Sequence, residues 1–188
     1  MSEKKFSDKS LLEQTVLSGI YGPPQLKGEE RQYLLGQFRE RVIKVLTFAQ
    51  IAEPGTYSEI REAMAHPQAK RLIISRRARL SSANEYLRLA RKHHLAFTTV
   101  DSPEFIGPVG LVVAADEAVD IKEVTVPNRT ERLLAAGVPQ AVIDSTGRGL
   151  CKACLDLLKR VAPEEIPNYH RANLLDWLIG NQCPCKKK

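Results

Sequence analysis

The sequence has few of the features that mark membrane, secreted or fibrous proteins. No stretch of its 188 residues approaches the roughly 18 consecutive apolar residues of a membrane-spanning helix. Four cysteines are too few for a disulfide scaffold, and no apolar run follows the basic first residues, so we expect no secretory signal. Hydrophobic residues make up 43% of the chain and charged residues 27%, values typical of a globular fold. We therefore expect a folded protein of the cytoplasm.

Sequence signatures of common enzyme classes are also missing. There is no Walker phosphate loop, no glycine-rich dinucleotide turn after a strand, no His-Glu-x-x-His and no Gly-x-Ser-x-Gly. Three histidines, His66, His93 and His94, have no serine, cysteine or aspartate partner at a motif spacing. The sequence thus favours a binding protein over an enzyme, although an active site is assembled in space rather than along the chain.

The order of apolar segments predicts an α+β fold. Short apolar runs that read as strands alternate with stretches of helical spacing, in the order β-α-β-α-β-β, which favours a mixed, mostly parallel sheet with flanking helices. Helical crossovers between strands are typical of parallel strands. The predicted strands cover residues 41–47, 72–75, 97–100, 111–115 and 121–126, and the predicted helices cover residues 10–19, 29–38, 56–66 and 81–94.

From Asn128 onward the strand signal disappears. Helical patterns over residues 130–136, 140–144, 150–161 and 169–179 predict an all-α C-terminal appendage. We therefore expect two parts, an α+β domain over residues 1–127 and a helical extension with four cysteines over residues 128–188.

Several segments of the first part resemble the YueI-like family of small bacterial cytosolic proteins. The resemblance rests on GIYGPPQLKGEERQYLLGQFRERVIKVLT, LIIS and GPVGLVVAADEAV and covers roughly residues 10–126. It implies a compact α+β domain similar to the chorismate-mutase-like folds, a group that also includes ribosomal-protein-like RNA binders. It implies no activity or catalytic residues, and the helical tail lies outside it.

One segment carries the excess positive charge of the chain. Residues Lys70–His94 contain eight lysines and arginines and a single acid, Glu85, a local net charge of +7 in a chain whose net charge is +6. The remaining residues together are therefore almost neutral. The candidate anion- or nucleic-acid-binding residues in this segment are Arg76, Arg77, Arg79, Ser81, Ser82, Arg88, Arg91 and Lys92.

The predicted geometry of this segment favours an anionic partner, RNA or another polyanion. The first three arginines precede a helix start, where free backbone N–H groups suit phosphate, and the last three basic residues form one helical stripe. Two alternatives remain open: the charges are solvated only, or acids such as Asp116, Glu117 and Asp120 pair with them. Because Tyr86 is the one aromatic residue in the segment, the sequence indicates no stacking platform for bases.

All four cysteines lie in the extension, as Cys151-x-x-Cys154 and Cys183-x-Cys185. Two cysteine pairs are a sequence pattern typical of a tetrahedral zinc site. Such a zinc would be structural, and His170 could replace one of the four cysteine ligands. The second pair is tighter and the 28-residue separation longer than in most such sites. A redox-sensitive pair and ordinary core thiols therefore remain as alternatives, and no other cofactor is indicated.

Three functions are compatible with these patterns. The first is a non-enzymatic binding module with a basic surface for RNA or another polyanion. The second is an interaction or assembly protein that uses the helical tail for a protein partner or for self-association. The third is a sensor or enzyme for a small phosphorylated ligand at the helix start of Ser81 and Ser82. None of the three involves a membrane.

Overall fold

The computed structural model describes residues 28–78, 80–178 and 183–186. The helix predicted over residues 10–19 and the candidate residue Arg79 lie outside these ranges. The elements of the first part are α3 (Gly28–Tyr33), η1 (Arg39–Arg41), β1 (Val42–Thr47), α4 (Phe48–Ala52), α5 (Ser58–Ala65), β2 (Ala69–Ser75), α6 (Leu80–Lys92), β3 (Ala96–Val100) and β4 (Val109–Ala115). The second part holds α7 (Arg129–Ala135), α8 (Gln140–Ile143), β5 (Gly149–Leu150), α9 (Lys152–Val161), η2 (Pro163–Asn168), β6 (His170–Arg171), α10 (Leu174–Leu178) and η3 (Pro184–Lys186).

The predicted α+β class, with a mixed sheet and flanking helices, is confirmed. The four strands β1–β4 form one sheet in the spatial order β1-β4-β2-β3. Strands β1, β2 and β3 run in one direction, as their helical crossovers predict. Strand β4 is antiparallel to both of its neighbours, β1 and β2, and β2–β3 is the parallel pair. The expectation of mostly parallel pairing is therefore wrong, because β4 follows a loop with no crossover helix and inserts between two parallel strands.

The fifth strand predicted over residues 121–126 does not form. The segment lies beside β1, and the Val45 N–H donates to the Val124 carbonyl at 2.9 Å. Side chains take up the other carbonyls: Arg39 Nη2 donates to Ile121 and Lys122, and Lys44 Nζ donates to Glu123. Because these carbonyls already have side-chain partners, the segment forms no ladder of backbone hydrogen bonds with β1.

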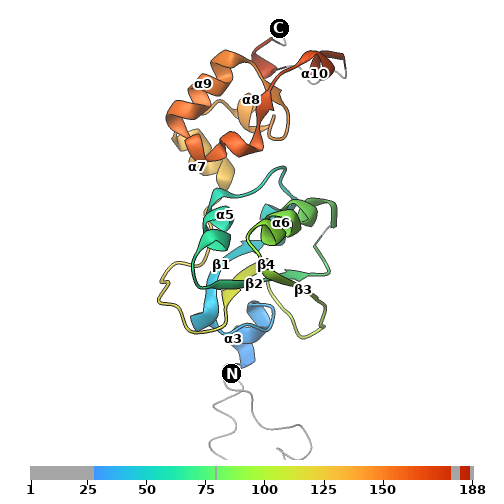
Figure 1. Cartoon of the computed structure of the whole chain (residues 1–188), viewed down its shortest axis with the longest axis vertical. Helices are drawn as coiled ribbons and strands as arrows, with labels where there is room; N and C mark the ends of the chain where they lie inside the picture. The colour runs from blue at the N-terminus through green and yellow to red at the C-terminus, as the bar shows by residue number, and fades with distance from the viewer. Residues whose placement is uncertain (1–27, 79, 179–182, 187–188) are drawn as a thin grey trace, which may run out of the picture.

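Helices cover both faces of the sheet (Figure 1). On one face Leu72, Ile74 and Leu111 pack with α5 and α6 in a buried cluster. On the other face Ile73 and Val112 pack against Leu34 and Leu35, which follow α3. Strand β4 is buried along almost its whole length, whereas β3 at the sheet edge is mainly exposed. No helix within the described ranges has the length and hydrophobicity that crossing a bilayer requires.

The helix predicted over residues 29–38 ends earlier than expected. Helix α3 stops at Tyr33, and Leu35 and Gly36 follow with positive φ values of 52° and 85°. The Gly36 N–H donates to the Arg31 carbonyl at 2.7 Å, a closure typical of a left-handed C-cap. This turn directs the chain into η1 and β1.

The C-terminal part is mainly helical rather than all-α as predicted. Strands β5 and β6 pair in parallel over two residues each. Their close approach requires a glycine, since a Cβ at Gly149 would lie 2.8 Å from Ala172 Cα. The helix predicted over residues 169–179 begins only at Leu174 for this reason, because His170 and Arg171 are taken up in β6.

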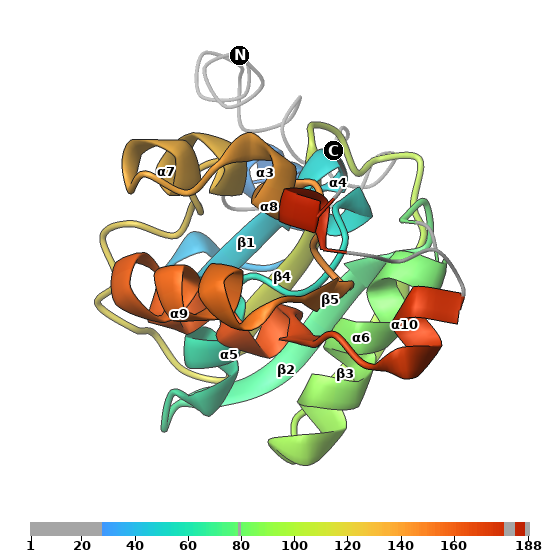
Figure 2. The same cartoon turned by 90° about the horizontal axis from the view of Figure 1, so that it is seen from above.

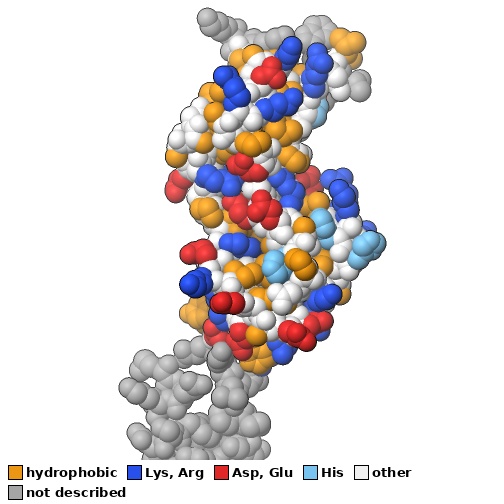
Figure 3. Space-filling model, turned by 60° about the vertical axis from the view of Figure 1, so that its left-hand side comes forward, with side chains coloured by type: hydrophobic (Ala, Val, Ile, Leu, Met, Phe, Trp, Pro, Cys, Tyr) orange, Lys and Arg blue, Asp and Glu red, His pale blue; other side chains and the backbone are white. Residues whose placement is uncertain are grey.

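The C-terminal part has a hydrophobic cluster of its own, centred on Leu133, Leu150 and Leu158. The C-terminal part lies above the side of the sheet that α5 covers, as the two orthogonal views show (Figures 1 and 2). Acidic and basic side chains lie next to one another at the level where the two parts meet (Figure 3). Polar contacts therefore contribute to this junction, in contrast to the apolar interior of each part.

Candidate metal centre and anion-binding surfaces

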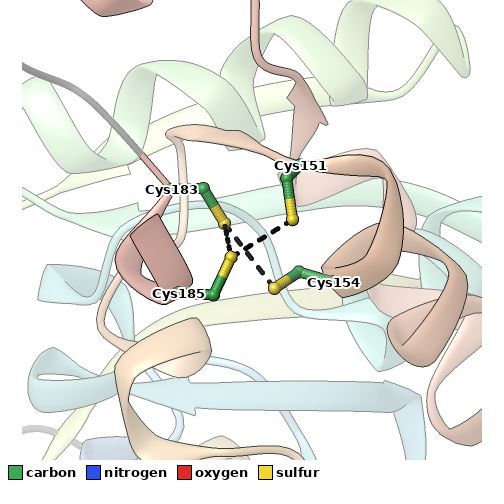
Figure 4. A group of neighbouring side chains, drawn as sticks. All are labelled: Cys151, Cys154, Cys183 and Cys185. Carbon is green, nitrogen blue, oxygen red and sulfur yellow. Dashed lines mark hydrogen bonds between the residues drawn. The ribbon is translucent and has the colours of Figure 1, made fainter. Parts of the chain in front are cut away.

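The four cysteines of the extension converge on one point (Figure 4). The sulfur of Cys185 lies 3.3 Å from that of Cys151 and 3.4 Å from that of Cys183, and the Cys154 and Cys183 sulfurs are 3.6 Å apart. All four sulfurs lie within 4.8 Å of one another, and all four are free thiols. A disulfide would require a distance near 2.05 Å. We term these four residues the four-cysteine site.

Local structure explains how two cysteine pairs separated by 28 residues meet here. Cys151 follows β5 and is the N-cap of α9, and Cys154 lies one turn later on the buried face of that helix. Cys183 is only 2% exposed and belongs to the hydrophobic cluster of the C-terminal part. Cys185, in η3, is exposed. The chain therefore returns to the start of α9 and places a second pair of thiols over the first.

The thiols perturb one another's acidity. The backbone N–H of Cys154 lowers the pKa of Cys151 to about 7, although the contact falls short of full hydrogen-bond geometry. Burial raises the pKa of Cys154, and interaction with the Cys151 thiol raises that of Cys185 to about 11. Crowding of four sulfurs thus opposes ionisation of some of them. A cation among them would reverse this effect, since metal ligation requires thiolates.

The geometry allows the four-cysteine site to hold one metal ion. A tetrahedral ion with sulfur at about 2.3 Å places its ligands about 3.8 Å apart, close to the three distances given above. Four protein ligands would leave no position for a substrate or water, which is typical of structural ions. His170 is not among these ligands, because its Nε2 lies 3.1 Å from both carboxylate oxygens of Asp176.

The predicted basic segment is divided by the fold into two groups. Helix α6 has 13 residues and separates its two ends by about 18 Å. Arg76, Arg77 and Ser81 lie at its amino end, and Arg88, Arg91 and Lys92 at its carboxyl end; all six are exposed. Arg79 and the side chain of Ser82 are outside the described structure. The candidate residues therefore cannot all contact one compact ligand.

The group at the carboxyl end of α6 gains one residue from the sheet. Strand β2 begins where α6 ends, since Arg71 pairs with Ala96, four residues beyond Lys92. This brings the exposed Lys70 to the same edge of the sheet. Arg71 is also there but forms an ion pair with Asp116 at 2.8 Å. We term Lys70, Arg88, Arg91 and Lys92 the amino-edge surface, and in the described part of the chain none of the four forms an ion pair.

Two phenylalanines contact this basic segment, and the sequence analysis missed both. The guanidinium of Arg91 lies 5.4 Å from the centroid of the Phe97 ring, and that of Arg77 lies 5.1 Å from that of Phe48. Phe97 is 43% exposed on β3. Pairing β3 with β2, as the crossover pattern suggests, would have placed Phe97 beside α6. Nothing in the sequence pattern places Phe48 beside Arg77. Tyr86, the aromatic residue of the segment, is fully buried.

These observations define an α+β protein with a mixed four-stranded sheet and a mainly helical extension that carries a four-cysteine site. A family described as "Protein of unknown function (DUF1694)" matches residues 9–125, and the chain belongs to this family. The match confirms the YueI-like resemblance. The four cysteines and the whole of α7–α10 lie beyond the matched residues.

The relatives of the chain point to the same family. It is 33% identical over 102 residues to "Uncharacterized protein YueI" of Bacillus subtilis (strain 168), an alignment that covers 54% of this chain and 77% of that protein. The crystal structure of the YueI protein from Bacillus subtilis is similar, with a TM-score of 0.53 and 29% identity. That likeness covers 63% of this chain and 92% of the other. The extension is therefore mostly additional to what the two proteins share.

Proposed function

We propose that this protein is a non-enzymatic binding protein whose C-terminal extension is organised by one zinc ion in the four-cysteine site. The observation that carries this proposal is the convergence of four free thiols within 4.8 Å. Four thiolates in a tetrahedral arrangement suit zinc, which has no redox chemistry of its own. The ion would be structural, with Cys151, Cys154, Cys183 and Cys185 as its ligands.

The role of the ion follows from the position of its ligands. Cys183 precedes the single 3-10 turn η3 and is buried in the hydrophobic cluster of the C-terminal part, whereas Cys185 within the turn is exposed. Ligation would join this turn to the first turn of α9, and the free energy of metal binding would become free energy of folding for the extension. The proposal therefore expects chelation to destabilise the extension before the sheet domain.

Metal analysis of the purified full chain tests this proposal. We expect one zinc per chain, and loss of that zinc in Cys185→Ser. This variant removes the exposed ligand and leaves the buried thiols in place. His66→Ala, at a partly exposed position of the sheet domain, serves as the control and should keep its zinc. Equal metal content in Cys185→Ser and the parent chain, stoichiometric iron instead of zinc, or a chain without metal would each contradict the proposal.

A second candidate function is binding of RNA or another polyanion at the amino-edge surface. It is supported by four exposed basic side chains without an ion-pair partner in the described ranges. Lysine and arginine contacts to phosphates release counterions, so affinity should fall steeply with salt. We expect a labelled single-stranded RNA to bind in low salt and to dissociate when salt is added.

The matched variants for this test remove equal charge from two places. Arg88→Ala/Arg91→Ala/Lys92→Ala should weaken RNA binding at least about tenfold. Lys152→Ala/Lys159→Ala/Arg160→Ala removes three exposed charges from α9 and should leave it nearly unchanged. An equal loss of RNA affinity in both variants would mean that binding depends on the net charge of the protein rather than on the amino-edge surface. Binding of neither RNA nor heparin by the parent chain would leave the amino-edge surface as solvated side chains, one of the alternatives considered from the sequence.

A further inference from the structure

A cavity lies at the opposite edge of the sheet from the amino-edge surface. Its volume is about 320 Å³ and it is lined by Phe48, Ala52, Arg77 and Ala78. Phe48 directly follows β1, and Arg77 and Ala78 follow β2. Because β1 and β2 run in the same direction, their carboxyl ends lie at this same edge, one on each side of β4. Ligands in open α/β sheets bind at the carboxyl ends of parallel strands, so the position is a suitable one.

The cavity combines one cation with an apolar wall. The Arg77 guanidinium is stacked over the Phe48 ring at 5.1 Å from its centroid, and its Nη2 donates to the Phe105 carbonyl at 3.3 Å. Within the described residues it forms no ion pair. A guanidinium has five N–H donors, and one of them is used in this contact. Arg77 is thus held over the cavity with donors left for an anion.

The amino end of α6 favours phosphate as that anion. The helix begins two residues after Ala78, has 13 residues and carries no acidic side chain in its first turn. The backbone N–H groups and the positive dipole end of such a helix stabilise phosphate groups nearby. The helix end alone would define no site; here Ala78 and the stacked Arg77, which line the cavity, lie two and three residues before the helix.

We propose that this cavity binds a small phosphate monoester with a flat apolar body, of the size of a mononucleotide. Arg77 contacts the phosphate, and Phe48, Ala52 and Ala78 contact the body. A cavity of this volume is at the small end of the range for small-molecule sites. The site is independent of the zinc and polyanion proposals, because it shares no residue with the four-cysteine site or the amino-edge surface.

Isothermal titration of the full chain with adenosine monophosphate tests the proposal. We expect saturable binding of one ligand per chain, weakened at least about tenfold in Arg77→Ala because the charge-assisted hydrogen bonds are lost. Arg160→Ala, which removes the same charge from an exposed position on α9, should bind normally. Since Arg77 is exposed, its variant should keep the parent melting temperature, so that loss of binding reports on the site.

Further ligands and one further variant distinguish the parts of the site. Inorganic phosphate and benzoate should each bind at least about tenfold more weakly than adenosine monophosphate, and Phe48→Leu should weaken the nucleotide more than it weakens inorganic phosphate. Equal affinity for the nucleotide and inorganic phosphate would contradict the proposed contact of Phe48, Ala52 and Ala78 with the apolar body. Tighter binding of benzoate than of the nucleotide would contradict the proposed contact of Arg77 with a phosphate. Equal binding by Arg77→Ala and the parent chain, equal loss in Arg77→Ala and Arg160→Ala, or no binding by the parent chain would overturn the proposal as a whole.

Discussion

The guanidinium of Arg129 lies 4.2 Å from the centroid of the Tyr57 ring. Arg129 belongs to the first turn of α7 in the extension, whereas Tyr57 is the N-cap of α5 in the sheet domain. Both side chains are buried, and Arg129 Nη1 donates to the Pro54 carbonyl at 2.6 Å. The extension is thus joined to the sheet domain through a buried cation rather than through an apolar surface alone.

Glu165 supplies the countercharge at this junction. It is fully buried; its Oε1 accepts a hydrogen bond from Arg132 Nη2 at 2.5 Å, and its Oε2 lies 3.7 Å from Arg129 Nε. Arg132 also pairs with Glu59 of α5. Among the residues that the structure describes, Arg129 Nε and Nη2 have no hydrogen-bond partner. Glu165 is therefore the fully buried carboxylate that both arginines share, while Glu59 also pairs with Arg132 and Glu53 Oε2 lies 4.0 Å from Arg129 Nη1.

Glu165→Gln should destabilise the protein by about 3 kcal/mol, because it leaves two buried or half-buried guanidinium groups without their shared countercharge. Urea unfolding at neutral pH measures this loss. The neighbouring Glu164→Gln is the matched control, since the contact of Glu164 to Arg61 is made by its backbone carbonyl. Equal stability of the two variants would contradict the role assigned to Glu165.

Gly55→Ala should cost more stability than Gly137→Ala. Both glycines have positive φ, 79° and 85°, so both substitutions bear the same backbone strain of about 1 kcal/mol. A Cβ at Gly55 would also lie 2.8 Å from Asn168 Oδ1, whereas nothing lies within 4 Å of one at Gly137. Overpacking should add about 1–3 kcal/mol at Gly55. Thermal melts of the two variants measure the difference. Equal melting temperatures would mean that Asn168 moves aside from the added Cβ without loss of stability.

The stability of the protein should fall as the pH rises above 10. Burial raises the pKa of Tyr86 to about 12, while the unfolded chain releases this proton near pH 10. The neutral tyrosine thus stabilises the fold fully below pH 10, and this contribution of about 2–3 kcal/mol is lost between pH 10 and 12. The difference in unfolding free energy between the parent chain and Tyr86→Phe, measured at pH 8 and pH 11, should shrink accordingly. A difference that does not change with pH would contradict a buried, neutral Tyr86.

The sheet could be predicted only in part. Apolar runs such as Leu111–Ala115 identify the strands, and helical crossovers give the common direction of β1, β2 and β3. The insertion of β4 between β1 and β2 leaves no local signal, because residues 101–108 form a loop of a length that reaches several sheet positions. Pairing such as Ile73 with Val112 is decided by packing of whole faces.

The candidate sites divide in the same way. The spacing of Cys151 and Cys154 predicts a pair of metal ligands, and the structure brings Cys183 and Cys185 close to them despite the unusual separation. The contacts of Arg91 with Phe97 and of Arg129 with Glu165 could not be predicted, since each depends on how separate elements pack. A short sequence motif predicts a ligand pair or a helix cap only where its residues are close together in the sequence.

X-ray absorption at the zinc edge of the purified full chain measures the ligands of the proposed zinc ion. We expect a first shell of four sulfur atoms at about 2.3 Å. A first shell with nitrogen or oxygen in place of any sulfur, or an absence of bound zinc, would contradict a four-cysteine zinc centre.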